Sequence, residues 1–149
     1  AGKVSLVGVF VDDILFVGDT ALRERFFELL ASEFKCTDLG ECKFFLGIHV
    51  VRDWGERSIL IHQTLYCEQI LERFGLRNGN GCTTPATGTI LVPRAGDACD
   101  FIVELDGKPF PFREAVGALM YLYTCTRPDI GYALIAVAAF MAHPSAENF

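Results

Sequence analysis

Two adjacent carboxylates, Asp12 and Asp13, are the side chains near the start of the chain that are best suited to chemistry. They lie between two apolar runs rich in β-branched residues, 4–11 and 14–18, a composition typical of buried strands. A tight turn at or beside the pair folds the runs into a hairpin. Because like charges repel and burial removes their water, a buried pair needs a positive partner, and Mg²⁺ or Mn²⁺ prefers carboxylate oxygen. The alternative is a solvated turn that carries two aspartates.

The other metal-ligating residue types are scattered. The six cysteines form no Cys-x-x-Cys pair and the three histidines lie far apart, so a zinc site is not predicted. Nothing local supports a Cys–His nucleophile. We expect reduced thiols, because the sequence does not open on a secretory signal. The residues concerned are Cys36, Cys42, Cys67, Cys82, Cys99, Cys125, His49, His62 and His143.

Composition indicates one domain or two small ones. The chain has 149 residues, of which 51% are hydrophobic, enough to build a core. The net charge of −6 speaks against a simple nucleic-acid module that acts through its bulk field. No apolar run reaches the length of a membrane span, so no membrane partner is expected. We expect an intracellular protein of the cytoplasm or nucleus.

Periodicity predicts the elements around the carboxylates. An amphipathic helix that begins after an N-cap at Asp19 covers the hairpin. A strand follows, with Gly47 as a bulge or close-approach point, and a polar turn leads to a returning strand. The predicted ranges are a helix at Thr20–Phe34, strands at Cys42–Arg52 and Ser58–His62, and the turn at Asp53–Arg57.

The second half of the chain predicts helices separated by an irregular stretch. A helix over Gln63–Phe74 ends at Gly75, which suits its C-cap. Residues 78–111 show no strong periodicity, and we expect an extended segment there with a short strand or turn at Phe101–Leu105. Two apolar helices follow and pack with the first as a small bundle. Their predicted ranges are Phe110–Thr126 and, with Pro128 in the first turn, Arg127–Ala142.

Five stretches in order resemble the reverse transcriptase of copia-type long-terminal-repeat retrotransposons. Phe10-Val11-Asp12-Asp13 resembles the tyrosine-x-aspartate-aspartate motif, with phenylalanine in place of tyrosine. Each stretch alone is a weak signal, whereas five at natural spacings over nearly the whole chain are a strong one. The other four are Asp38–Glu41 with Phe44–Ile48, Gln63–Tyr66, Phe112–Leu122 and Thr126–Ile130.

The resemblance implies an α+β fold in which palm-type antiparallel hairpins and a covering helix precede a small helical thumb bundle. It divides the chain into a palm segment at 1–62 and thumb and connection helices at 63–149. It implies that Asp12 and Asp13 are catalytic and bind Mg²⁺ or Mn²⁺, in the context of a complete polymerase. The nucleic-acid-binding residues that it implies are Phe10 under the primer end, Phe45, Leu46 and Gly47 in the primer grip, and Arg73 and Arg77 in the thumb.

The family also uses an aspartate from an earlier strand and fingers that bind the nucleotide, and neither has a counterpart in this sequence. We therefore expect a segment that is incomplete as an enzyme and inactive alone. Its implied partners are an RNA or DNA template-primer, deoxynucleotides and the remaining fingers and palm, with self-association through open strand edges. The alternative is a non-catalytic interaction or structural protein derived from a retroelement remnant, and the solvated-charge interpretation of Arg73 and Arg77 stays open beside phosphate contact.

Overall fold

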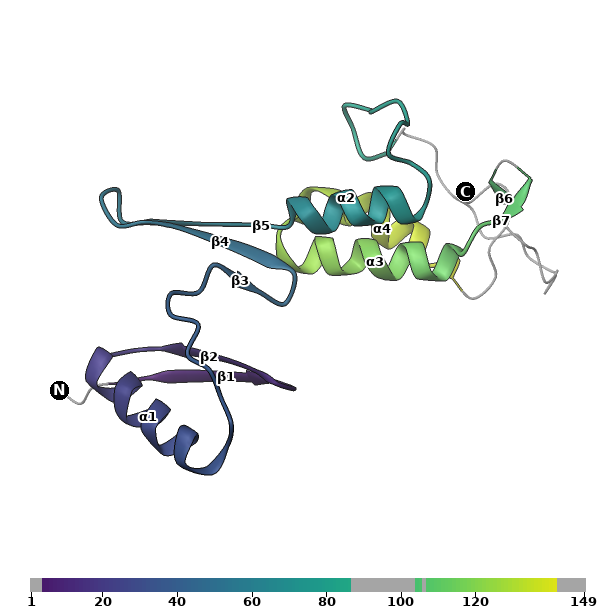
Figure 1. Ribbon diagram of the computed structural model, residues 1–149. Coiled ribbons are helices and arrows are strands. Elements are labelled where there is room, and N and C mark those ends of the chain that lie inside the picture. Colours follow the sequence, from purple (N-terminus) through teal and green to yellow (C-terminus); the bar gives the residue numbers. More distant parts are fainter. Residues whose placement is uncertain (1–3, 87–103, 106, 142–149) are drawn as a thin grey trace. The chain divides into compact units, whose positions relative to one another are not determined.

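The protein is described by a computed structural model that places residues 4–86, 104–105 and 107–141. It comprises two compact units, Ala1–Ile61 and His62–Phe149, and each is described by itself. In the described residues, the first unit carries strands and one helix, and the second carries helices and a short hairpin (Figure 1). The architecture is mixed α and β with small sheets, which confirms the predicted α+β class.

The two apolar runs form the predicted hairpin. Strand β1 (Leu6–Phe10) pairs antiparallel with β2 (Asp13–Val17), in a register that sets Phe10 opposite Asp13. The two residues between the strands therefore form the turn, and Val11 in that turn has a φ of +51°. A positive φ at the first turn residue matches the right-handed twist of the flanking strands.

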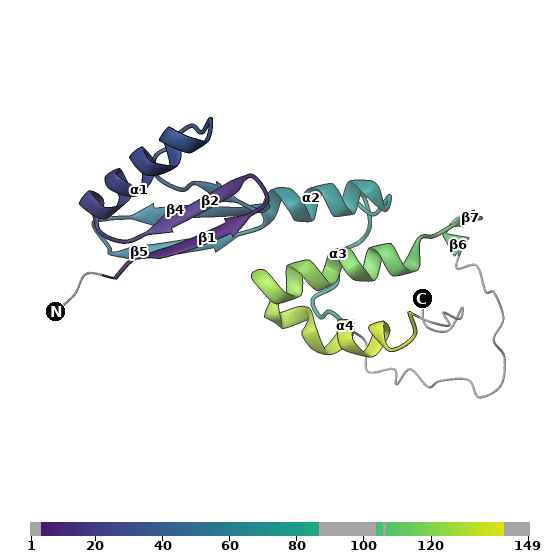
Figure 2. The ribbon, with the colours of Figure 1, turned by 90° about the horizontal axis from the view of Figure 1, so that it is seen from below.

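The hairpin strands are largely exposed, so the prediction of buried strands was wrong. Leu6 and Val9 are each 67% exposed. Helix α1 (Thr20–Glu33) lies beside the hairpin (Figures 1 and 2), where the rings of Phe16 and Phe26 are 5.6 Å apart between centroids. One helix covers only part of a two-stranded sheet, which leaves apolar side chains in water. The predicted N-cap is confirmed, because the Asp19 carboxylate accepts a hydrogen bond from the Ala21 amide.

A second sheet follows, with strand order β3 (Phe44–Phe45), β4 (Ile48–Asp53) and β5 (Ser58–His62). The predicted single strand at Cys42–Arg52 was wrong, because the chain reverses at Leu46 and Gly47. Their φ angles are +49° and +79°, which is the backbone of a two-residue hairpin turn. Gly47 adopts this conformation freely, so it is a turn residue rather than a bulge.

Helix α2 (Thr64–Arg73) opens the second unit and ends in a Schellman motif. The Leu76 amide donates to the Leu71 carbonyl and the Gly75 amide donates to the Glu72 carbonyl. Gly75 has a φ of +70°, which a glycine tolerates and a residue with a Cβ does not. The sequence prediction that the helix ends at Gly75 is confirmed.

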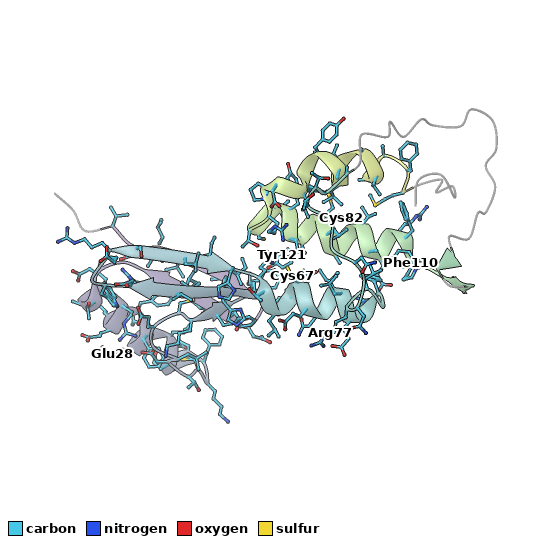
Figure 3. The ribbon with its side chains drawn as sticks, turned by 90° about the horizontal axis from the view of Figure 1, so that it is seen from above. Glu28, Cys67, Arg77, Cys82, Phe110 and Tyr121 are labelled. Carbon is cyan, nitrogen blue, oxygen red and sulfur yellow. The ribbon has the colours of Figure 1, made fainter. Side chains whose placement is uncertain are left out.

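Helix α3 (Phe112–Cys125) is the centre of the second unit, since it packs on α2 at one side and on α4 (Gly131–Ala138) at the other. Figure 3 shows Cys67 and Tyr121 together between α2 and α3, where Tyr121 meets Tyr66 edge to face at 5.2 Å. In the described residues, the buried apolar side chains all belong to this unit. They are Ile70, Phe74, Phe112, Ala115, Val116, Leu122, Leu134 and Phe140.

The last helix is shorter than predicted. A 3-10 turn, η1 (Pro128–Ile130), precedes α4, which ends at Ala138 rather than near 142. The irregular stretch predicted at 78–111 falls partly outside the described residues, as does most of Phe101–Leu105. Its described end forms a hairpin of β6 (Glu104–Leu105) and β7 (Lys108–Pro109). Among the described helices, none combines the length and apolarity that a bilayer crossing requires.

Gly131 permits the close packing of α4 on α3. A Cβ at this position would lie 2.3 Å from a ring carbon of Tyr123. We expect Gly131→Ala to lower the free energy of unfolding by about 1–3 kcal/mol through overpacking. The matched control is Gly117→Ala in α3, which meets nothing within 4 Å and is expected to stabilise by about 0.5–1 kcal/mol. Urea unfolding followed by circular dichroism measures both, and equal effects would contradict the packing argument.

The open strand edges predict self-association. Among the described residues, the β1–β2 sheet has two strands and therefore two unpaired edges, which recruit further strands. We expect size exclusion with light scattering to show oligomers that Val9→Lys reduces. The same change in central strand β4, Val51→Lys, is expected to leave them intact. A monodisperse wild-type monomer across a concentration series would overturn this expectation.

Candidate functional site

The two carboxylates lie at the tip of the β1–β2 hairpin. Asp12 occupies the turn and Asp13 is the first residue of β2, and both are exposed. Directly opposed residues of an antiparallel pair point to the same face, so the Asp13 carboxylate shares a face with the Phe10 ring. The hairpin therefore brings together an aromatic ring and a carboxylate, with a second carboxylate one residue away.

The turn is built with strained backbone. Val11 is 82% exposed and is β-branched, yet it adopts the left-handed region. That conformation costs a non-glycine residue about 1–2 kcal/mol, and such positions concentrate at functional sites. The strain gives the two-residue reversal that holds Asp12 at the tip.

The carboxylate pair suits a hard divalent cation in its chemistry. Mg²⁺ is usually held by one or two carboxylates together with waters and substrate phosphates, and Asp12 and Asp13 offer that number on exposed positions. Within the described parts of the chain, no group of three or more histidine, cysteine, aspartate or glutamate side chains is placed to hold a metal ion. Further ligands would thus be waters, substrate phosphates or residues outside these parts.

The predicted primer-grip residues lie at the tip of their own hairpin. Phe45 ends β3 opposite Ile48, and Leu46 and Gly47 are the two turn residues between them. Gly47 presents backbone without a side chain at this tip, so another molecule can approach the main chain closely. Behind the tip, the Phe44 and His49 rings are in edge contact at 4.9 Å.

The two arginines predicted to contact nucleic acid are engaged in exposed ion pairs. Arg73 in α2 pairs with Glu114 in α3, and Arg77 pairs with Glu72 at 3.3 Å. Both arginines belong to the second unit, whereas Asp12, Asp13 and the grip residues belong to the first. The ion pairs support the structural interpretation of these charges, and phosphate contact stays a prediction.

Several residues of the family-like stretches have structural contacts. The Gln63 side chain is 2% exposed and its Oε1 accepts a hydrogen bond from the Thr126 hydroxyl at 2.8 Å, which joins the start of α2 to the end of α3. Arg127 and Asp129 form a two-pronged ion pair with N–O distances of 2.8 and 2.7 Å. The guanidinium lowers the pKa of Asp129 and the carboxylate raises that of Arg127.

Asp38 fastens the loop after α1. Its carboxylate accepts hydrogen bonds from the Gly40 amide at 2.8 Å and from the Arg23 guanidinium at 2.5 Å. The Gly40 amide first, and then Arg23, lower the pKa of Asp38. The local Asp-x-Gly turn was readable from sequence, whereas the contact to a helix 15 residues away was not.

One aromatic site escaped the sequence analysis. Trp54 lies in the turn between β4 and β5, is 67% exposed, and has the Arg52 guanidinium 3.6 Å from its ring centroid. The turn itself was predicted from its polar and glycine residues. A lone tryptophan in a polar turn was the available signal, because such a ring has little to pack against within its own turn.

Comparison with known protein families shows the family to which the chain belongs. Residues 1–88, which include both carboxylates, the β3–β4 hairpin and α2, match the reverse transcriptase (RNA-dependent DNA polymerase) family. The chain belongs to this family. It is a reverse transcriptase-related segment of the retrotransposon kind, as the motif order predicted.

Three curated relatives match nearly the whole chain. The Retrovirus-related Pol polyprotein of a tobacco (Nicotiana tabacum) transposon is 35% identical over 95% of this chain, which spans 11% of that polyprotein. An uncharacterized mitochondrial protein of Arabidopsis thaliana is also 35% identical over 95%, and the match spans 55% of it. A second Pol polyprotein, from an Arabidopsis transposon, is 32% identical over 94%, with 9% of its length matched. No solved structure matches the chain.

The Asp38 contacts predict an acid-dependent loss of stability. Because the pKa of Asp38 is lower in the folded chain, its contribution is fully present above the unfolded carboxyl pKa of about 3.9. It is lost as the pH falls through the lowered folded value. We expect nuclear magnetic resonance titration to show this low pKa, and Arg23→Gln to raise it. Glu28→Gln, on the exposed surface of the same helix, serves as control, and an Asp38 pKa that is unchanged in Arg23→Gln would exclude the contact.

Proposed function

We propose that this chain forms the end of the palm and the thumb of an RNA-directed DNA polymerase, in which Asp12 is a direct metal ligand and Asp13 its partner. The observation that carries the proposal is the hairpin tip, where both carboxylates stand exposed beside Phe10 in a chain of the reverse transcriptase family. The family as a whole implies divalent metal, nucleic-acid and nucleotide partners.

The hairpin supplies negative charge at a tip that a triphosphate and a primer end can reach. Asp12 and Asp13 would hold divalent cations there, which would supply activation of the primer 3′-hydroxyl and charge neutralisation at the leaving pyrophosphate. Asp12, in the turn, is exposed and would be the direct ligand. Asp13 begins β2 and is anchored by the strand pairing, so its carboxylate is held in a more defined position.

Phe10 and the grip hairpin have positioning roles in this proposal. The Phe10 ring shares its sheet face with Asp13 and gives the terminal primer nucleotide an apolar surface to rest on. Leu46 and Gly47 form a half-buried two-residue turn whose backbone meets the primer strand closely in this proposal, and Phe45 anchors that turn through its pairing with Ile48. The missing hydroxyl of Phe10 affects fine positioning rather than chemistry.

The thumb contribution of Arg73 and Arg77 is proposed to be modest. Their guanidinium groups pair with Glu114 and Glu72, and the arginine side chains are 59% and 61% exposed. Exposed ion pairs contribute little free energy, so a phosphate group can compete for either arginine. Each contact nevertheless leaves a carboxylate nearby that repels the backbone of a nucleic acid.

A chimeric polymerase tests the proposal. The 144 matched residues of the tobacco transposon polyprotein are replaced by the corresponding residues of this chain, and primer extension is measured on an RNA template with Mg²⁺. We expect Asp12→Asn to lower the rate by at least about a hundredfold, because even the outer partners of metal ligands cost about 10- to 100-fold. Asp13→Asn is expected to have a smaller effect.

The control is Glu28→Gln, which removes an exposed carboxylate on α1 and is expected to leave extension unchanged. An active chimera that tolerates Asp12→Asn would disprove the metal role. The same chimera with Mn²⁺ in place of Mg²⁺ is expected to respond in the same way, since both ions favour carboxylate oxygen.

A non-catalytic role is the second candidate, favoured by one observation. The segment makes up 55% of the uncharacterized mitochondrial protein, against 11% and 9% of the two polyproteins, so it occurs in different protein contexts. A stand-alone interaction or structural protein would use the exposed apolar strands rather than the carboxylates. An inactive but folded chimera that still carries Asp12 and Asp13 favours this candidate.

A further inference from the structure

The turn between β4 and β5 displays an aromatic ring that the proposed catalytic tip does not use. Trp54 is the single tryptophan of the chain, and 67% of it is exposed. The Arg52 guanidinium carbon lies 3.6 Å from the ring centroid, within cation–π range. One face of the indole is thus covered by a cation, and the exposure of the residue leaves the other face open to solvent.

The turn holds this ring in a defined place. The Asp53 carboxylate accepts a hydrogen bond from the Glu56 amide at 2.9 Å, which fixes the backbone of the turn that carries Trp54. Arg57 has a φ of +51° and directs the chain into β5. A ring that is already ordered loses little conformational entropy when a second planar group stacks on it.

The geometry points to Trp54 as a stacking platform for an unpaired nucleic-acid base, with Arg52 on one face of the ring and Arg57, at the end of the same turn, as the cation for a phosphate. Aromatic rings that stack bases next to basic side chains are the general means by which single strands are bound without sequence preference. This inference deepens the proposed function, because it rests on the chain acting on nucleic acid, and it assigns a contact outside the catalytic tip.

A protein partner fits the same ring less well. Hot-spot tryptophans lie in the middle of a patch whose surrounding contacts exclude water. The four other residues of the turn region are Asp53, Gly55, Glu56 and Arg57, so the turn itself provides no apolar rim, and the exposed apolar side chains nearest in sequence lie on the strands, at Val51 and Ile59. The two acids do repel phosphate, but Arg52 stacks on the ring and Arg57 follows in the same turn, so the turn carries as many cations as anions.

Intrinsic fluorescence tests the platform directly, because Trp54 is the only tryptophan. The chain is titrated with a single-stranded oligonucleotide of about 12 nucleotides and, in parallel, with the blunt duplex of the same sequence. EDTA is present, so that no metal site contributes. We expect saturable quenching by the single strand and little by the duplex, whose bases are already stacked.

Variants test whether the ring contributes affinity, measured by anisotropy of a labelled oligonucleotide. We expect Trp54→Ala to weaken binding about fivefold or more, in line with the usual contribution of one stacked base. Arg52→Gln and Arg57→Gln are expected to weaken it less. The matched control is Tyr132→Ala, which removes an aromatic ring that is 86% exposed on α4 and is expected to change nothing. Circular dichroism melting confirms that each variant is folded.

Three outcomes overturn the inference. The first is the absence of quenching by the single strand, and the second is an equal affinity of Trp54→Ala and the wild type for the oligonucleotide. The third is a blue shift of the tryptophan emission as the protein concentration alone is raised, because such a shift would mean that the turn is a contact between copies of the chain. The result is independent of the polymerase test. If the oligonucleotide quenches Trp54 but polymerase activity does not depend on Asp12, the stacking platform is supported and the proposed catalytic role is not. If activity depends on Asp12 but no quenching occurs, only the stacking platform is excluded.

Discussion

Backbone in the left-handed region closes each of the three hairpin turns of the first unit. Val11, Leu46 and Arg57 are the non-glycine residues with positive φ in the described chain, and each lies in or at the end of a turn. A reversal of two or a few residues keeps the strands in register up to their ends. The Asp12 and Trp54 side chains and the Gly47 backbone therefore lie at defined points at the tips of the hairpins, where the strained turn residues are also found.

The two units are stabilised in different ways. In the described residues, every buried apolar side chain belongs to the second unit, where α3 packs between α2 and α4. The first unit depends on strand pairing, on the contact between Phe16 and Phe26 and on the polar link from Asp38 to Arg23. Its apolar strands stay exposed, a condition that soluble proteins usually relieve by covering such a surface with further chain or a partner.

The charged groups at the first hairpin tip and three arginines of the second unit also differ in whether they have a partner of opposite charge. The carboxylates at the first hairpin tip are not neutralised by neighbours on their own turn, since Val11 and Phe10 are apolar. In the second unit, Arg73, Arg77 and Arg127 are each paired with a carboxylate. Negative charge is therefore left at the first tip, whereas these three arginines of the second unit have their charge offset by carboxylates.

The sequence by itself determined the features that depend on near neighbours. Asp19 caps α1 and Gly75 ends α2 because capping involves residues within one turn of the helix, and the order of the family-like stretches identified the reverse transcriptase. Tertiary structure alone decided the rest. Whether the apolar strands are buried depends on how much surface α1 covers, and the partners of Arg73 and Asp38 lie on elements distant in sequence. The reversal at Leu46 was hidden because an apolar run is compatible with either one long strand or two short ones. The stacking of Arg52 on Trp54 likewise could not be predicted, because residues i and i+2 of an extended chain share a face whether or not their side chains adopt the rotamers that stack.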